Sequence, residues 1–535
     1  MDRAIDCLLI GHNQTKFTLY EQTVREMGLN SGAYRDLNQN MIRYNNRQLS
    51  AADTFNLFCS DDQRVQPIKR VESFNAAIAY LGTYLSRRGL TFDYVNSFQD
   101  EKEELSEKLQ HERFRVAAII TTLYVTPTPI IEIIDFIREY NQEVKIVVGG
   151  PFVSTRVRTL EVRELDYLLD SIIGADYYVN SSQGETALVK IIQAQKNGSP
   201  QENINNIYYR EGGKYVSTPI LKEENKLSDN MVNWDLFADR VGEFVNVRTA
   251  ISCPFSCAFC GFPRHAGEYQ TAGVAGIEAE LNRLHRIKTV KSLLFVDDTF
   301  NIPVKRFKEI LRMMVRNKYN FKWNANFRCQ FADRETLELM KESGCQSVFL
   351  GIESGNDQIL KNMNKAVKVE AYLKGIALLK EFAIPTFGSF IIGFPGESPR
   401  TAEDTIKFIN ESDLDFSRAH LWYCEPITPV WQEREKYGLR GESFEWSHDT
   451  MDSKTACHII EQMILSIREP VRFPQYYFDY DTVMQLTHKG FTLDQVKQFL
   501  MIFNDAVREK LPASSRKEVS FDIVMRLRKL GSLRE

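Results

Sequence analysis

The sequence predicts an α/β protein with a Rossmann-like doubly wound domain, a partial (β/α)6 barrel and a helical C-terminal region. Two long stretches of the chain alternate short apolar runs with amphipathic helical segments, which is the pattern of βαβ units in parallel sheets. A third stretch, residues 451–535, shows mostly helical periodicity. With 535 residues the chain is too long for one hydrophobic core, so two or three domains are expected.

The first alternating series predicts a Rossmann-like domain over residues 1–225. Its strand candidates are the apolar runs 6–10, 92–95, 116–120 and 144–150, with helical patterns at 74–90 and 130–141. Residues 203–219 predict a hairpin that turns at Gly212–Gly213. The polar segment 14–73, rich in Asn, Arg and Tyr, is expected to be an irregular insertion of the functional kind.

The second series predicts a barrel over residues 226–450. Its six strand candidates are 244–251, 292–298, 321–329, 347–354, 385–395 and 418–424. Amphipathic helical patterns lie between them, for example at 304–317 and 334–344. Six βα repeats are fewer than the eight of a complete TIM barrel, so a partial barrel is expected.

Composition and charge are those of an ordinary soluble globular protein, which is expected in the cytoplasm. Hydrophobic residues make up 43% and charged residues 26%, the net charge is −4, and the isoelectric point is about 6.2. This balance gives no basic face for nucleic acid, and no apolar run is long enough for a membrane span or a secretory signal. The odd count of nine cysteines, six of them scattered, favours a reducing compartment over a disulfide framework.

Three cysteines with C-x3-C-x2-C spacing are the strongest chemical signal in the chain. Cys253, Cys257 and Cys260 lie in "ISCPFSCAFCGF", directly after the first predicted barrel strand, where the mouth of a barrel carries its chemistry. A structural zinc site needs four ligands, and His265 is one possible fourth. A [4Fe–4S] cluster held by only three cysteines leaves one iron open to an exchangeable ligand. A tight turn with three buried thiols is the remaining alternative.

This motif resembles that of the radical S-adenosylmethionine (SAM) superfamily, including the aromatic Phe259 before the third cysteine. In that family SAM chelates the open iron through its amino and carboxylate groups. One electron from the cluster then splits SAM into methionine and a 5′-deoxyadenosyl radical. The resemblance implies that the three cysteines ligate a [4Fe–4S] cluster, that SAM is bound, and that a donor such as flavodoxin or ferredoxin supplies the electron.

Four later strand ends resemble the elements that hold SAM in this family. "FVDDTFN" offers Asp297 and Asp298 for the SAM amino group, although either could instead be the N-cap of the next helix. Arg328 in "NFRCQF" has the fork that suits a carboxylate. Glu353 in "GIESG" would lie near the ribose or methionine, and Gly393 in "IIGFPGE" near the adenine.

The N-terminal domain resembles the cobalamin-binding domain that precedes the barrel in one class of this superfamily. "TTL" stands where that class has S-x-L, so Thr121 and Leu123 would contact the nucleotide tail of cobalamin, and Gly149–Gly150 would let the tail pass close to the backbone. His12 in "IGHNQT" lacks the neighbours of the cobalt-ligating motif, so no histidine ligand is expected. The alternative is that the glycine pair is an ordinary loop and the domain binds nothing.

Together these elements resemble the class B radical SAM methyltransferases and, within that class, the phosphorus-methylating branch and its relatives. It implies transfer of a methyl group from methylcobalamin to an unactivated carbon or a phosphinate phosphorus of a small molecule, in natural-product biosynthesis. The substrate candidates are Trp422, Tyr423, Glu425, His448 and the stretch 43–46, although these aromatic residues could equally belong to the core. A non-methylating rearrangement or cyclisation and a non-catalytic zinc-stabilised binding module remain as alternatives.

Overall fold

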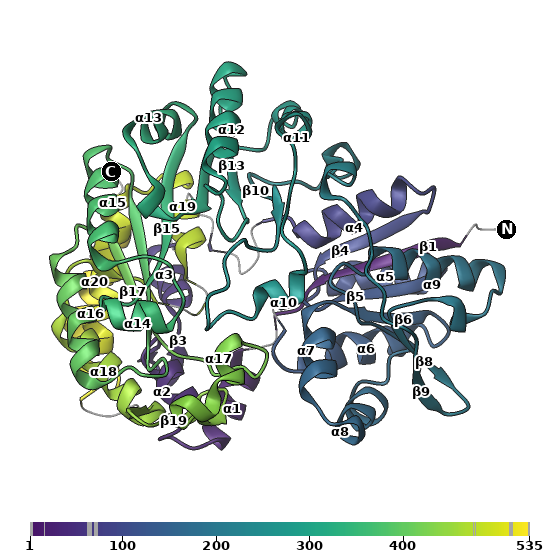
Figure 1. Cartoon of the computed structure of the whole chain (residues 1–535), viewed down its shortest axis with the longest axis horizontal. Coiled ribbons are helices and arrows are strands. Elements are labelled where there is room, and N and C mark those ends of the chain that lie inside the picture. Colours follow the sequence, from purple (N-terminus) through teal and green to yellow (C-terminus); the bar gives the residue numbers. More distant parts are fainter. Residues whose placement is uncertain are drawn as a thin grey trace. The chain divides into compact units, whose positions relative to one another are not determined.

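The computed structural model describes residues 4–14, 17–60, 67–68, 73–122, 124–474, 476, 478–512 and 517–532. Contacts between residues divide the chain into two compact units. The first unit comprises Met1–Phe17, Ser73–Pro254 and Gly261–Lys291, and the second comprises Thr18–Glu72, Phe255–Cys260 and Ser292–Glu535. Figure 1 shows the elements of both units by label and colour.

The first unit contains a seven-stranded sheet with the order β4-β1-β5-β6-β7-β8-β9. Its strands are β1 (Ile5–His12), β4 (Phe92–Ser97), β5 (Phe114–Ile120), β6 (Lys145–Gly149), β7 (Tyr177–Val179), β8 (Ile207–Glu211) and β9 (Lys214–Ser217). The first five in this order are parallel, and β8 and β9 form an antiparallel hairpin around Gly212 and Gly213, as predicted. The direction of strand addition reverses at β1, which lies between β4 and β5, so the predicted doubly wound fold is confirmed.

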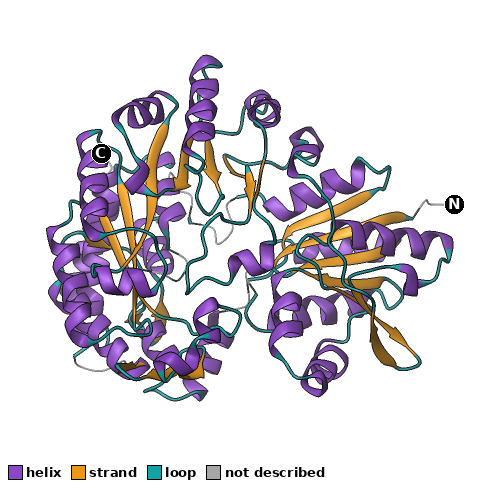
Figure 2. Cartoon of the chain, in the orientation of Figure 1, coloured by secondary structure: helices purple, strands orange, loops and turns teal. Residues whose placement is uncertain are grey.

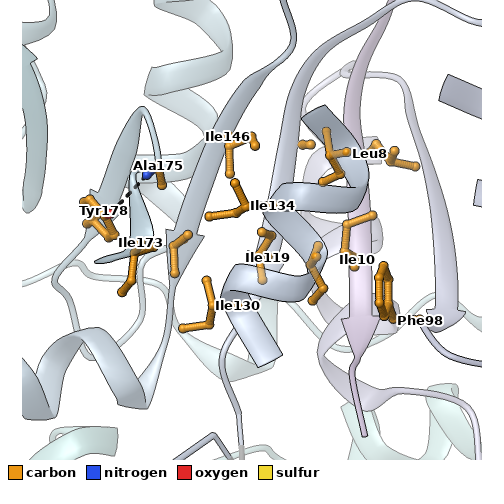
Figure 3. Packing of buried hydrophobic residues seen from close by; sticks show 14 of the residues in the cluster. Leu8, Ile10, Phe98, Ile119, Ile130, Ile134, Ile146, Ile173, Ala175 and Tyr178 are labelled. Carbon is orange, nitrogen blue, oxygen red and sulfur yellow. Dashed lines mark hydrogen bonds between the residues drawn. The ribbon is translucent and has the colours of Figure 1, made fainter. Parts of the chain in front are cut away.

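Helices connect these strands and bury the sheet. They are α4 (Ala76–Ser86), α5 (Lys102–His111), α6 (Thr128–Tyr140), α7 (Pro151–Thr159), α8 (Val162–Tyr167) and α9 (Glu185–Asn197). Figure 3 shows Leu8, Ile10, Ile119 and Ile146 of the strands packed with Ile134 of α6. Strands with both faces covered need continuous apolar runs, which explains why these strands were readable from the sequence.

The first unit also contains short elements on either side of the cysteine motif. The predicted strand 244–251 is two short strands, β10 (Phe244–Val247) and β11 (Ala250–Ile251). Strand β11 pairs with β12 (Gln270–Thr271), and the helices α10 (Phe262–Ala266) and α11 (Val274–Arg286) belong to the same region.

The second unit contains six parallel strands that are neighbours in chain order (Figure 2). They are β13 (Ser292–Phe295), β14 (Lys322–Asn326), β15 (Cys345–Glu353), β16 (Thr386–Ile392), β17 (Phe416–Leu421) and β21 (Val471–Arg472). The helices between them are α12 (Val304–Arg316), α13 (Arg334–Glu342), α14 (Asp357–Asn362), α15 (Val369–Glu381) and α16 (Pro399–Glu411). Strand-by-strand addition through helical crossovers is the topology of the predicted partial barrel.

The C-terminal region is mostly helical, as predicted. It contains α18 (Ser453–Ser466), α19 (Tyr480–His488), α20 (Leu493–Lys510) and α21 (Phe521–Ser532). Before it lie α17 (Pro429–Gln432) and a small antiparallel sheet of β18 (Arg440–Glu442), β19 (Glu445–His448) and β20 (Met451–Asp452). None of the helices in the described part of the chain is long and apolar enough to cross a membrane.

The insertion 14–73 differs from the expectation of irregular structure. It forms α1 (Phe17–Glu26), α2 (Gly32–Asn38), a hairpin of β2 (Ile42–Tyr44) and β3 (Arg47–Leu49), and α3 (Ala51–Cys59). Local signals explain the helix starts: Ser31 caps α2, and Ser50 with Asp53 forms a capping box on α3.

Residues 18–72 group with the second unit, whereas the sequence interpretation counted the insertion with the N-terminal domain. Arg35 of α2 pairs with Glu461 of α18 at 2.7 Å, and Lys510 of α20 donates to the carbonyls of Asn38 and Met41. These contacts join the insertion to the C-terminal helices. The contacts group residues 292–535 in one unit, so they do not test the predicted boundary at residue 450. The predicted boundary at residue 225 likewise stays a prediction.

Candidate active site

The predicted SAM-binding residues lie at consecutive strand ends of the second unit. Asp297 follows β13, Arg328 follows β14, Glu353 ends β15, and Gly393 follows β16. These four strands are parallel neighbours in the sheet, so their carboxyl ends share one edge. The structure therefore brings the four elements to the edge where barrel enzymes carry their chemistry.

The cysteine motif forms a loop between β11 and α10. The division into units passes through this loop after Pro254, and none of the three cysteines forms a disulfide within the described residues. Cys257 is buried, whereas Cys253 and Cys260 are partly exposed. The amide of Cys260 donates to the carbonyl of Cys257 at 3.1 Å, which is a tight turn that keeps these two residues close.

Backbone hydrogen bonds tie the loop to other parts of the second unit. The amide of Ala258 donates to the carbonyl of Met363 at 2.8 Å, and the amide of Val430 donates to the carbonyl of Ala258 at 2.9 Å. The side-chain amide of Asn364 adds a bond from Nδ2 to the carbonyl of Ser256 at 2.8 Å. The main chain of the loop is thus held by contacts that do not use the cysteine thiols.

A mononuclear zinc site is the alternative that the sequence left open for this loop. Within the described residues, no three His, Cys, Asp or Glu side chains converge closely enough to hold a single metal ion. A four-iron cluster has no such requirement, because each cysteine binds a separate iron. His265, the possible fourth zinc ligand, instead lies with Nε2 at 3.3 Å from the hydroxyl of Thr155 on α7, and burial lowers its pKa.

Arg328 faces the cysteine loop. Its Nη2 lies 3.5 Å from Cys257 Sγ, and its guanidinium stands 3.4 Å above the ring of Phe255. The side-chain oxygen of Asn301 accepts from the Arg328 amide at 3.0 Å, and Arg328 Nη1 donates to the carbonyl of Lys365 at 3.2 Å. A buried guanidinium beside Cys257 fits the negative charge of a thiolate-ligated cluster.

Glu353 forms a buried ion pair with Lys365. The two side chains are only 10% and 7% exposed, and Glu353 Oε1 lies 2.9 Å from Lys365 Nζ. Glu353 has a positive φ of 71°, which is unusual for a residue with a side chain and directs this strand end away from regular pairing. A Cβ atom at Gly351 would lie 2.6 Å from Glu353 Oε1, so glycine is needed there to make room for the pair. The Lys365 ammonium also lies 5.4 Å from the ring centre of Phe259.

Asp297 and Asp298 are side by side but differ in environment. Asp297 is buried, and its carbonyl accepts from Asn326 at 3.1 Å. Asp298 is an exposed residue, but protein atoms surround its carboxyl group. This desolvation, together with the negative charge of Asp297, raises the pKa of Asp298 to about 7. The alternative role as a helix cap is wrong for both residues, because α12 begins at Val304 with Pro303 at its N-cap.

Gly393 lies in a set of close contacts after β16. Its φ is 95°, and a Cβ atom there would lie 2.2 Å from the Trp446 ring. The Gly393 amide donates to Glu397, and the Gly393 carbonyl lies 3.2 Å from His448 Nε2. Trp446 stacks on His448 with an interplanar angle of 6°. His448 and Glu397 thus fix the main chain at the strand end predicted to contact adenine.

The other substrate candidates fall into three groups, namely a core residue, two partly exposed residues and the stretch 43–46. Trp422 is a core residue, 2% exposed, with its ring 5.6 Å from Phe394 and 5.2 Å from Trp446. Tyr423 and Glu425 follow it and are partly exposed. The stretch 43–46 is the tip of the β2–β3 hairpin, where Arg43 pairs with Glu518 at 3.0 Å, and no contact described for it joins it to the strand ends.

The predicted cobalamin residues lie at the carboxyl ends of β5 and β6 in the first unit. Thr121 is fully buried, donates from its hydroxyl to the Gly149 carbonyl at 2.9 Å, and accepts from the Phe152 amide at 3.3 Å. Gly150 has φ 115° and ψ −165°, and a Cβ atom there would lie 2.8 Å from Thr121 Oγ1. Only glycine fits this backbone, which is the property the prediction required of the site. Leu123 lies outside the described residues.

His12 ends β1 and packs on an aromatic ring. Its ring centre lies 5.5 Å from that of Tyr124, and burial lowers its pKa. The next residue, Asn13, donates from its amide to the Tyr124 hydroxyl at 2.6 Å. Because β1 is the strand where the sheet order reverses, this edge between β1 and β5 is where doubly wound folds bind ligands.

Sequence reasoning missed Lys365 and Asn301, which position Glu353 and Arg328. Asn301 closes the strand-end segment "FVDDTFN", in which only the two acids were singled out, and Lys365 lies away from any predicted strand end. Lys365 follows α14 in "NMNKAV", where nothing in the pattern distinguishes it from an exposed lysine. Only the structure shows that it is 6% exposed and paired.

The comparisons identify the class of the second alternating series. Residues 248–409 match the model of the Radical SAM superfamily. This segment holds the three cysteines and the four strand ends described above, so this part of the chain is similar to the Radical SAM superfamily in the region that carries the candidate site.

Two curated proteins have sequences similar to a longer part of this chain. An uncharacterized methyltransferase of Pyrococcus horikoshii is 28% identical over 302 residues, 55% of this chain and 64% of the relative. The anaerobic magnesium-protoporphyrin IX monomethyl ester cyclase of Cereibacter sphaeroides is 25% identical over 67% of this chain and 60% of the relative. The chain therefore spans less than two thirds of the length of these curated relatives.

A solved structure shares the fold. The radical SAM methyltransferase TsrM of Kitasatospora setae, solved with cobalamin and a [4Fe–4S] cluster, superposes with a TM-score of 0.57 over 69% of this chain and 76% of that chain. Its sequence is 18% identical, so the likeness supports the two-part α/β fold.

Proposed function

We propose that the protein is a cobalamin-dependent radical SAM methyltransferase that acts on a small molecule. The observation that carries this proposal is the combination of a C-x3-C-x2-C loop in a radical SAM domain with a doubly wound sheet whose glycine pair lies at the ligand-binding edge. The methyl acceptor would be an unactivated carbon or a phosphinate phosphorus, within natural-product biosynthesis.

In this proposal Cys253, Cys257 and Cys260 hold a [4Fe–4S] cluster. When bound, the cluster supplies the electron that cleaves SAM, and cobalamin supplies the transferable methyl group. Arg328 would offset the negative charge of the cluster through its contact with Cys257. Three cysteines outside any disulfide and a buried cation beside one of them fit this cofactor on chemical grounds.

The strand ends would position SAM. The Asp297–Asp298 pair offers carboxylate oxygens for its amino group, and Glu353 would contact the ribose or methionine. Lys365 acts on Glu353 by holding its carboxylate in one place. Gly393, with its amide and carbonyl fixed by Glu397 and His448, would present main chain to the adenine.

In the first unit the nucleotide tail of cobalamin would pass Gly149 and Gly150. Because the Thr121 hydroxyl is bonded within the protein, its proposed role changes from a direct tail contact to support of the glycine loop. His12 packs on Tyr124, and no histidine is assigned to cobalt. Cobalamin would then be held by its tail and by surrounding contacts.

A second function has one observation in its favour. The similar cyclase of Cereibacter sphaeroides supports the alternative of a rearrangement or cyclisation on the same scaffold. The methyltransferase proposal is preferred because the Pyrococcus relative and the superposed structure both carry that name. A flavodoxin or ferredoxin as electron donor and a cytoplasmic location belong to the proposal.

Anaerobic purification and reconstitution test the cofactor set. The proposal predicts a brown protein that absorbs near ~400 nm with about four irons per chain, and a corrinoid spectrum after incubation with cobalamin. A colourless protein with one zinc per chain would instead support a zinc-stabilised binding module. Iron without any corrinoid binding would leave a radical SAM enzyme that does not use cobalamin.

A further inference from the structure

Strand β17 places a basic pair on the same sheet face as Gly351 and Ser389. Arg418 and His420 are two residues apart and therefore point to the same face of the strand. Arg418 is in register with Ser389 of β16, which is in register with Gly351 of β15. Gly351 is the residue that makes room for the Glu353–Lys365 pair, so the basic pair belongs to the same face as that pair.

An aromatic layer lies before this row. Phe416, two residues before Arg418, stacks on Phe387 with ring centres 4.3 Å apart, and Phe473 meets Phe387 edge-on at 5.5 Å. The Arg418 guanidinium lies 5.3 Å from the Phe473 ring centre. Arg418 thus lies on β17 between this aromatic layer and the strand end.

The Arg418 charge has no ion-pair partner among the described residues. Its side chain is half-buried, and its Nε donates to His420 Nε2. Desolvation lowers its pKa to about 10, so it stays protonated at neutral pH. The nearest acids, Asp36, Asp479 and Glu353, influence it only beyond ion-pair distance.

Each of those acids already has its own partner. Asp36 accepts from the Tyr476 hydroxyl at 3.0 Å, Asp479 caps α19, and Glu353 pairs with Lys365. No acid in the described residues lies within ion-pair distance of the Arg418 guanidinium, although these three act on it at longer range. Its Nη1–Nη2 edge therefore keeps donors for two oxygens of an anion from outside the chain.

The neighbouring arginine shows the opposite arrangement. Arg472 donates from Nη2 to the Gln39 carbonyl at 3.1 Å and to Asn40, and from Nη1 to Asn504 Oδ1 at 3.2 Å. This guanidinium is fully used in joining α2 and α20 to β21. Arg418 has no comparable structural role, because its Nη groups make no hydrogen bond within the described part of the second unit.

We propose that Arg418, positioned by His420, binds an anionic oxygen group of the methyl acceptor, namely a carboxylate, phosphinate or phosphate. This inference rests on the proposed function, because it assigns the acceptor to the barrel interior. The planar Nη1–Nη2 edge of Arg418 matches two oxygens of such a group. His420 accepts from Nε and is therefore neutral there, and it fixes the guanidinium plane so that this edge faces the ligand.

The test uses the reconstituted full chain with inorganic phosphate and acetate as probes. Line broadening of the 31P and 13C signals reports their binding at equilibrium. Wild type should show saturable broadening, and Arg418→Gln should weaken the apparent affinity at least tenfold. Arg434→Gln is the matched control, because Arg434 is exposed on the surface and should bind the probes as wild type does.

The two probes also separate the sources of the anion. Tighter binding of phosphate indicates a phosphorus oxyacid, and tighter binding of acetate indicates a carboxylate. If Arg418→Gln does not fold, Arg418→Lys serves instead, since it keeps the charge and loses the fork, and a several-fold weaker affinity is expected. Unchanged binding in either folded variant, or no saturable binding in wild type, would overturn the proposal.

SAM cleavage separates this inference from the proposed function. Arg418→Gln should still release 5′-deoxyadenosine under dithionite at the wild-type level, because the residue is assigned to the acceptor. Loss of both SAM affinity and cleavage would assign Arg418 to the SAM carboxylate and overturn the inference. Absence of cleavage in wild type would refute the proposed function itself, whatever the anion titration shows.

Discussion

Replacing Lys365 by methionine should destabilise the second unit strongly. Methionine keeps the length and apolar stem of the lysine but removes the ammonium that pairs with Glu353 at 2.9 Å. The Glu353 side chain is 10% exposed, so water does not replace the lost partner. Breaking a buried ion pair by removing one member typically costs about 3–5 kcal/mol.

The expected shift in melting temperature follows from the size of the second unit. For a unit of about 300 residues, an unfolding entropy of ~2.1 cal/mol/K per residue gives roughly 0.6 kcal/mol/K. A cost of about 3–5 kcal/mol then lowers the midpoint by about 5–8 °C. Differential scanning calorimetry of Lys365→Met and wild type measures this shift, with the transition of the second unit as the readout.

The matched control is Lys374→Met in the exposed pair Lys374–Glu370. Both side chains there are 75% exposed, so the change should cost at most about 0.5 kcal/mol and shift the midpoint by less than about 1 °C. The double variant Glu353→Gln with Lys365→Met should regain much of the loss, because it leaves no unpaired charge. Equal midpoints for Lys365→Met and Lys374→Met would refute the buried pair.

Three further predictions concern cofactors and pH. Gly150→Val should lower cobalamin occupancy and leave the iron–sulfur spectrum unchanged, because the new Cβ would meet Thr121 at 2.8 Å in a backbone conformation that only glycine adopts easily; full occupancy in the variant would contradict the proposed tail path. His12→Ala should leave both cobalamin binding and the cobalt spectrum unchanged, and a shifted spectrum would identify His12 as a ligand. Burial raises the pKa of Glu397 from 4.5 to about 8, so the folded chain keeps a proton that the unfolded chain releases, and this contribution to stability is lost as the pH rises from about 4.5 to about 8. Glu397→Gln has no such titration, so thermal midpoints measured from pH 5 to pH 8 should shift in favour of the variant as the pH rises, and a constant difference would contradict the assignment.

The sequence predicted the strands and their ends well for a physical reason. Parallel strands covered on both faces need unbroken apolar runs, and the chain leaves such a strand at a polar or glycine residue. This is why Asp297, Arg328 and Gly393 were found at their strand ends, and why Gly150 was singled out. The lengths of the strands were predicted less well: β13 ends at Phe295 and β14 at Asn326, short of the predicted runs, whereas β1 and β5 are longer than predicted.

Contacts between distant segments were beyond the reach of the pattern. The grouping of residues 18–72 with the C-terminal helices depends on pairs such as Arg35–Glu461, which lie more than four hundred positions apart. The burial of Lys365 and the unpaired charge of Arg418 likewise depend on what packs around them. Trp422 proved to be a core residue because aromatic side chains suit cores and sites equally.

Release of 5′-deoxyadenosine from SAM under dithionite tests the central claim most directly, since it requires the cluster and no acceptor. Wild type should form it, and alanine at Cys253, Cys257 or Cys260 should abolish it while the chain stays folded. Alanine at Cys345 or Cys424 should leave iron content and product formation intact, because both thiols are buried and bonded elsewhere in the second unit. Product formation by a variant lacking any of the three loop cysteines would contradict the account.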